Sequence, residues 1–103
     1  MVEVIWTASA LQDLSDIGEF ISRDSTRYAE LTVFELFTYT DILEAHPLSG
    51  KKTEDFNDSS IRQLIKGSYR VVYKIISKDR IDVLTVHNCA RLISNTKYFR
   101  SKK

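Results

Sequence analysis

The chain has 103 residues, of which 43% are hydrophobic and 28% charged. This size and composition suit a single domain over residues 1–103 that fills its own core. No window approaches the ~20 apolar residues that cross a bilayer, and no signal-peptide pattern is present, so we expect a cytoplasmic protein without a membrane role. Two histidines 41 residues apart, one cysteine and three isolated glycines match no usual metal or nucleotide motif. We therefore expect no metal and no cofactor.

Charge is distributed unevenly along the chain, although the net charge is only +1. Residues 1–60 hold four basic and twelve acidic side chains, a balance of −8, whereas residues 61–103 hold eleven basic and two acidic ones, a balance of +9. Clustered positive charge attracts polyanions and acidic protein segments. The C-terminal part is expected to meet such a partner, unless the two parts neutralise each other within the fold.

The N-terminal end predicts a strand followed by an amphipathic helix. Residues 2–6 are rich in β-branched and aromatic side chains, which favour a strand, and Thr7 is a good helix N-cap. Beyond it, apolar side chains recur at three- and four-residue steps, which predicts a helix of about four turns. The residues in this repeat are Leu11, Leu14, Ile17 and Ile21.

A second helix is predicted to complete a helical hairpin. Asp24 or Ser25 can cap it, and it should run to about Ala45, because His46-Pro47 then ends it. Its main apolar stripe is accompanied by further apolar residues on other faces, Leu31 and Phe34 among them. A helix that is apolar on several sides needs more than one packing partner.

The C-terminal half predicts a β-meander. Residues 47–60 are polar and rich in turn formers and predict a loop, and strands are expected at 61–65, 69–76 and 80–87. The connections are too short for parallel crossovers, so these strands should be antiparallel and the hairpin should cover one face of the sheet. The expected fold class is α+β, with an N-terminal strand, a helical hairpin and an antiparallel meander packed against the helices.

Alternation along the strands predicts which side chains share a face of the sheet. In the middle strand, Arg70 and Lys74 should point away from the face that carries its tyrosines. In the last strand, strict alternation groups one set of side chains on one side, namely Ile81, Val83, Thr85 and His87. It groups the other set on the opposite side, namely Asp82, Leu84 and Val86.

The candidate chemistry lies on this meander. Arg62, Arg70 and His87, with Asn88 beside it, stand on three successive strands that can bring them together. Arginine offers planar, permanently charged donors to phosphate, and histidine titrates near neutrality and can move a proton. Such a set could cleave RNA without a metal. The alternative is structural: Arg70 pairs with an acid such as Asp82 or with the carboxyl-rich helices, and His87 is a partly buried histidine with its hydrogen bonds satisfied.

Several motifs, in order and spacing, resemble the RelE/ParE superfamily of toxins over roughly residues 2–93. They are Trp6-Thr7-x-x-Ala10, Asp13-Leu14-x-x-Ile17, Pro47-x-x-Gly50, Arg62-x-Leu64-x-x-Gly67-x-Tyr69-Arg70-Val71-Val72-Tyr73 and Val86-His87-x-x-Ala90-Arg91-Leu92. The resemblance implies the toxin of a type II toxin–antitoxin pair, neutralised by a cognate antitoxin whose C-terminal segment lies across the helices and sheet. An acidic, partly disordered antitoxin segment would suit the basic half and the apolar second helix.

The resemblance leaves two target classes open, because ParE-like members poison DNA gyrase whereas RelE-like members cleave mRNA on the ribosome. The long hairpin favours the ParE-like class. In that case the residues expected to bind target or antitoxin are Arg62, Arg70, Arg91, Leu31 and Phe34.

The nuclease alternative rests on fewer matches. RelE-like toxins carry lysines at positions that correspond here to Ile61 and Gln63. YoeB-like nucleases imply catalytic roles for Arg70, Glu54 and His87, but Asn88 stands where they have a tyrosine. A diverged binding module without catalytic activity is the third possibility.

Overall fold

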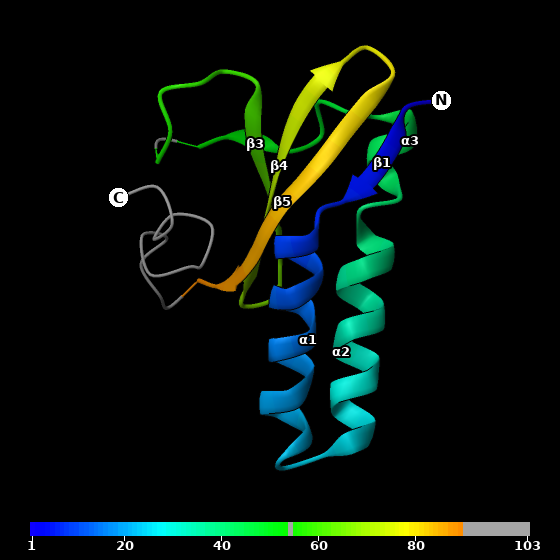
Figure 1. The fold of residues 1–103 in the computed structure, drawn as a ribbon, viewed down its shortest axis with the longest axis vertical. Coiled ribbons are helices and arrows are strands. Elements are labelled where there is room, and N and C mark those ends of the chain that lie inside the picture. The colour runs from blue at the N-terminus through cyan, green and yellow to red at the C-terminus, as the bar shows by residue number, and fades with distance from the viewer. Residues whose placement is uncertain (54, 90–103) are drawn as a thin grey trace.

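A computed structural model describes residues 1–53 and 55–89, arranged as Figure 1 shows. The described elements are β1 (Glu3–Trp6), α1 (Ala8–Ser22), α2 (Thr26–Tyr39), α3 (Ile42–Ala45), β2 (Lys51–Lys52), β3 (Ile61–Lys66), β4 (Tyr69–Ser77) and β5 (Arg80–Asn88). The strand, helical hairpin and meander expected from the sequence are present, which confirms the α+β fold class. The short strand β2 is an addition, because it lies inside the segment predicted as a loop.

The strands form a mixed sheet in the order β1-β5-β4-β3-β2. Strands β2 to β5 pair antiparallel, as their short connections require. β1 instead pairs parallel to β5, with Glu3 opposite Arg80 and Trp6 opposite Val83. Because β1 covers only the first part of β5, the remainder of β5 has no strand neighbour on that side among residues 1–53 and 55–89.

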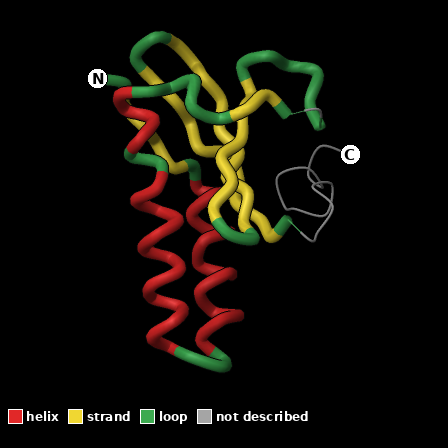
Figure 2. Tube along the Cα trace, turned by 180° about the vertical axis from the view of Figure 1, so that it is seen from behind, coloured by secondary structure: helices red, strands yellow, loops and turns green. Residues whose placement is uncertain are grey.

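The helical hairpin closes this free edge of β5. The carboxylate of Asp13 on α1 accepts a hydrogen bond from the backbone N–H of Val86 at 3.1 Å and another from the hydroxyl of Thr85. Each long helix begins at the predicted N-cap, because the hydroxyl of Thr7 accepts from Ala10 N–H and that of Ser25 from Tyr28 N–H. The closed end of the hairpin projects past the strands (Figures 1 and 2).

The second helix ends earlier than the sequence predicts. The expectation of one helix up to Ala45 is wrong, because α2 stops at Tyr39 and the short α3 follows. The hydroxyl of Thr40 donates to the backbone carbonyl of Phe37 and accepts from the indole N–H of Trp6 at 3.2 Å. Thr40 is thereby tied to β1, and the backbone continues through tighter bonds between residues three apart, such as Leu43 N–H to Thr40 C=O.

The strict alternation predicted for β5 is also wrong. Val72 pairs with Thr85 but Tyr73 pairs with Val83, so Leu84 is the extra residue of a β-bulge. The bulge shifts the alternation by one residue. Val86 therefore joins the core on the same side as Val83, and Leu84 packs on the opposite side of the sheet.

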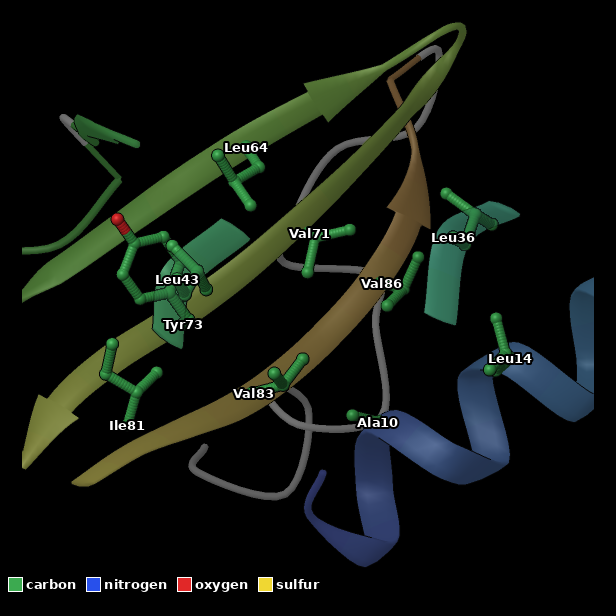
Figure 3. Packing of buried hydrophobic residues seen from close by; sticks show 10 residues of the cluster. All are labelled: Ala10, Leu14, Leu36, Leu43, Leu64, Val71, Tyr73, Ile81, Val83 and Val86. Atoms are coloured by element: carbon green, nitrogen blue, oxygen red, sulfur yellow. The ribbon is translucent and has the colours of Figure 1, made fainter. Parts of the chain in front are cut away.

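The main core lies between the helices and one face of the sheet, which we call the helix-side face (Figure 3). Leu14 of α1 and Leu36 of α2 point there toward Val71 and Val86, and all four are buried. A smaller cluster of Ile61, Val72 and Leu84 lies on the opposite face, which we call the outer face. Phe56, from the segment between β2 and β3, packs over that cluster. Within the described residues, every helix is too short or too polar to span a membrane.

Candidate functional site

Arg70 and His87 meet on the outer face of the sheet. They are direct cross-strand partners on β4 and β5, so their side chains share a face. The bulge at Leu84 sets this register, because Val72 is paired with Thr85 and Arg70 is two residues further along. The sequence-based expectation that adjacent strands bring an arginine and a histidine together is correct for this pair.

Arg70 is already paired with an acid. Its Nη1 lies 2.6 Å from Oδ2 of Asp55, and the two side chains are 22% and 36% exposed. The hydroxyl of Thr53 donates to the same carboxylate at 2.9 Å and accepts from Asp55 N–H. These two bonds within the loop help to orient the Asp55 carboxylate toward Arg70. The structural alternative, in which Arg70 pairs with an acid, is therefore correct. The acid is Asp55, however, and not Asp82, which pairs with Arg80.

The described part of the segment between β2 and β3 packs on the outer face. Phe56 packs on the cluster beneath it, Asp55 pairs with Arg70, and Asp58 lies 3.4 Å from Nζ of Lys74. Hydrogen bonds from Ser60 are the main cause that holds the pKa of Asp58 below its usual value, and Lys74 adds to the effect. Two acidic side chains of this segment thus neutralise two cations of β4.

His87 is buried, with 4% of its surface exposed. A general acid or base must come within hydrogen-bond reach of the proton that it transfers. With so little of its surface exposed, the imidazole is not open to a phosphodiester outside the protein. The site accordingly has the residue types of a metal-free nuclease but lacks open access to its titratable group.

Arg62 lies apart from Arg70 and His87. It is paired with Tyr73, whose ring belongs to the helix-side core, and its Nη1 donates to the carbonyl of Gly50 at 2.7 Å. The Tyr73 hydroxyl accepts from Gly50 N–H at 2.9 Å and donates to the Pro47 carbonyl at 2.8 Å. Burial raises the pKa of Tyr73. Together these two side chains anchor the Pro47-x-x-Gly50 turn to the sheet.

Leu31 and Phe34 are presented to solvent on α2, where 48% and 66% of their surfaces are exposed. Beside Leu31, a cavity of about 170 Å³ opens between α2 and the β3–β4 turn, with Tyr28, Lys66 and Tyr69 in its lining. Burial raises the pKa of Tyr69, and Tyr28 adds to the shift. The sequence indicated the apolar helix face but not the cavity, which depends on how the strand turn meets the helix.

Two of the residues expected to be functional, Glu54 and Arg91, lie outside the described residues. Asp55 and Phe56 were not anticipated, although a lone aromatic inside a polar loop is a signal that could have indicated packing against the sheet. Among residues 1–53 and 55–89, no three His, Cys, Asp or Glu side chains come together in a way that could hold a metal ion.

Two curated proteins resemble this chain over most of its length. Over 92 residues it is 26% identical to toxin RelE2 of Caulobacter vibrioides, an alignment that covers 89% of this chain and 100% of that protein. Over 83 residues it is 34% identical to Y4kP of Sinorhizobium fredii, named as a candidate toxin, with 79% of this chain and 81% of that protein covered.

Solved structures share the fold. The chromosomal ParDE system of P. aeruginosa includes a chain that superposes with a TM-score of 0.71 at 18% identity, covering 85% of this chain and 96% of that one. The toxin–antitoxin complex RelBE2 of Mycobacterium tuberculosis gives a TM-score of 0.58 at 22% identity, covering 84% and 96%.

The sequence model of the ParE toxins of type II toxin–antitoxin systems, parDE, matches residues 4–93. This match takes in β1 from its second residue, the hairpin and the whole meander, including Arg70 and His87. The chain therefore belongs to the ParE toxin family of type II toxin–antitoxin systems.

Proposed function

We propose that this toxin arrests bacterial growth by binding DNA gyrase, without nuclease chemistry of its own, and that a cognate antitoxin neutralises it. The match to the ParE toxins supports this proposal, because the resemblance of the sequence to ParE-like toxins implies gyrase as the target. The two solved neighbours come from a ParDE system and a RelBE2 toxin–antitoxin complex, which supports an antitoxin partner for this chain. Gyrase acts in the cytoplasm, where we expect this protein.

The observation that carries the proposal is the state of the Arg70–His87 pair. His87 is 4% exposed, and the guanidinium of Arg70 is held by Asp55 at 2.6 Å. A nuclease needs the imidazole at the reacting proton and the guanidinium at the phosphoryl oxygens. A protein that acts by binding needs neither group at a reacting atom, so a buried imidazole and an ion-paired guanidinium are compatible with that role.

The residues proposed to meet target or antitoxin fall into two groups. Leu31 and Phe34 offer exposed apolar surface, which suits the antitoxin. Arg70 and Arg91 are proposed for polar contacts with target or antitoxin, and Arg62 contributes through the turn that it anchors at Gly50.

A ribosome-dependent mRNA endoribonuclease is the second candidate, because Arg70 and His87 are direct cross-strand partners. Under this reading, Arg70, His87 and Glu54 would be catalytic. One feature weighs against it: Ile61, which stands where RelE-like toxins have a lysine, is buried beneath Phe56. A basic side chain would not belong at that position here.

Substitution of His87 separates the two candidates. His87→Gln keeps a polar side chain of similar length, and we expect it to leave growth arrest largely intact. Loss of a general acid or base would instead lower a nuclease rate by about 10²–10⁴. The measurement is the growth of cells that express each toxin without antitoxin.

The control is thermal unfolding of the purified variant, because His87 is buried and its replacement can affect stability. A variant that stays folded at the growth temperature and no longer arrests growth would contradict the gyrase proposal and favour the nuclease.

A further inference from the structure

An exposed apolar stripe runs along the solvent side of α2. Leu31, Phe34 and Phe37 follow one another at three-residue steps, and each has close to half or more of its surface exposed. Large apolar side chains that stay exposed along one helix face are typical of binding sites, and Phe37 at the end of the stripe also contacts the ring of Trp6.

The stripe borders the cavity between α2 and the β3–β4 turn. Leu31 belongs to both, and Tyr28 and Tyr69 add aromatic surface to the cavity lining. A cavity of about 170 Å³ is large enough for one apolar side chain. We call the stripe and the cavity together the α2 groove.

The α2 groove lies in an acidic part of the molecule. Residues 8–45, which form the helices, hold eight acidic and two basic side chains, a balance of −6. Residues 61–88, which form the three long strands, hold six basic and two acidic ones, a balance of +4. The molecule therefore has an acidic helical arm and a basic sheet.

Carboxylates beside the α2 groove remain available for a partner. Glu30 precedes Phe34 by one helical turn, and Glu35 lines the cavity. Neither forms an ion pair within the described part of the chain, where the salt bridges join Arg70, Lys74 and Arg80 to other acids. Lys66 also lines the cavity, but its Nζ lies 5.2 Å from the centre of the Tyr39 ring.

We propose that the α2 groove binds a basic amphipathic segment of the antitoxin, with an apolar side chain in the cavity and lysines or arginines facing Glu30 and Glu35. This inference rests on the proposed function, in which an antitoxin neutralises the toxin. The antitoxin segment over α2 would then be basic, whereas the segment expected over the sheet is acidic. An acidic segment would set like charges side by side along α2, which is unfavourable.

Photo-crosslinking tests the charge of the occupant directly. The toxin is expressed with Phe34→p-benzoylphenylalanine, its complex is purified from the native host and irradiated, and the attached peptide is identified by mass spectrometry. We expect an antitoxin peptide with net positive charge. The matched control is Ile65→p-benzoylphenylalanine, an exposed apolar position on β3 in the basic sheet, where we expect no such basic peptide.

The alternative occupants give distinct results. A neutral or acidic antitoxin peptide at position 34, a crosslink to a second copy of the toxin, a crosslink to its own residues 90–103, or no crosslink within an intact complex would each overturn the inference. Failure to obtain any antitoxin complex would instead contradict the proposed function.

Charge reversal provides a second measurement. Glu30→Lys with Glu35→Lys should weaken the affinity for the purified antitoxin by roughly tenfold or more at low salt, with a smaller loss at high salt. Asp16→Lys with Glu19→Lys makes the same change in net charge on α1, outside the α2 groove, and should have a clearly smaller effect. Equal losses for the two double variants, or tighter binding by the first, would overturn the inference.

Discussion

Tyr73 illustrates how one side chain links three parts of this molecule. It is fully buried in the helix-side core, yet its hydroxyl accepts from Gly50 N–H and donates to the Pro47 carbonyl. A Cβ at position 50 would lie 2.6 Å from that hydroxyl and 2.6 Å from the Gln63 carbonyl, so only glycine fits there. The glycine of the Pro47-x-x-Gly50 motif is thus required because the turn packs closely against Gln63 of β3 and Tyr73 of β4.

Tyr73→Phe removes both hydrogen bonds without removing the ring. The carbonyl and the N–H left behind lose their partners, so the free energy of unfolding at neutral pH should fall by about 1–3 kcal/mol. Urea denaturation measures this change. An unchanged free energy of unfolding would mean that water replaces both bonds.

The same variant should alter the dependence of stability on alkaline pH. Burial raises the pKa of Tyr73 above its ordinary value of 10, so the folded state holds the phenolic proton more tightly than the unfolded state. The stabilising contribution is complete below pH 10 and is lost as the pH rises further. Above pH 10 the wild type should therefore lose more stability than Tyr73→Phe does.

At the residue scale, the sequence identified the candidate pair but not its surroundings. Alternation along β4 correctly turned Arg70 away from the core. The partner of Arg70 could not be predicted, because Asp55 reaches it through a loop whose path depends on tertiary contacts. The place of Arg62 was missed for a related reason, since a strand position alone does not reveal that the Gly50 turn folds back over it.

At the element scale, the local sequence predicted where the helices begin better than where they end. Both long helices begin at their predicted caps, because a hydroxyl next to an amphipathic repeat is a local signal. The end of α2 depends on Trp6, which bonds Thr40 from 34 residues away. The bulge at Leu84 likewise arises from pairing with another strand.

The junction between α1 and β5 is the element contact most open to test. Asp13→Ala would leave the backbone N–H of Val86 without its acceptor and would remove the bond from the Thr85 hydroxyl. We expect the free energy of unfolding to fall by about 1–3 kcal/mol. The control is Asp16→Ala on the same helix, an exposed side chain bonded only to Gln12 in the described structure, which should change stability by less than about 0.5 kcal/mol.

Chemical denaturation of both variants provides the comparison. Similar losses for Asp13→Ala and Asp16→Ala would contradict the assignment of Asp13 as the acceptor that closes the edge of β5.

At the scale of the whole molecule, the acidic and basic parts of the sequence occupy different parts of the fold. Residues 8–45, with a balance of −6, form the helical arm, and residues 61–88, with a balance of +4, form the three long strands. Only part of the charge is neutralised between the two halves, where Asp55 and Asp58 pair with Arg70 and Lys74. The parallel pairing of β1 with β5 was not predictable from local pattern, because a single short strand does not specify which edge it will join. The fold class nevertheless followed from the change of periodicity near residue 60.

The proposed function requires that the toxin acts on gyrase by binding and does not cut RNA. The direct test expresses the wild-type toxin without antitoxin and measures, in the same cells, the DNA that is covalently linked to gyrase and the integrity of ribosome-bound mRNA. We expect gyrase-linked DNA to accumulate before growth stops, while the mRNA remains intact. Cleaved ribosome-bound mRNA without gyrase-linked DNA would contradict the account.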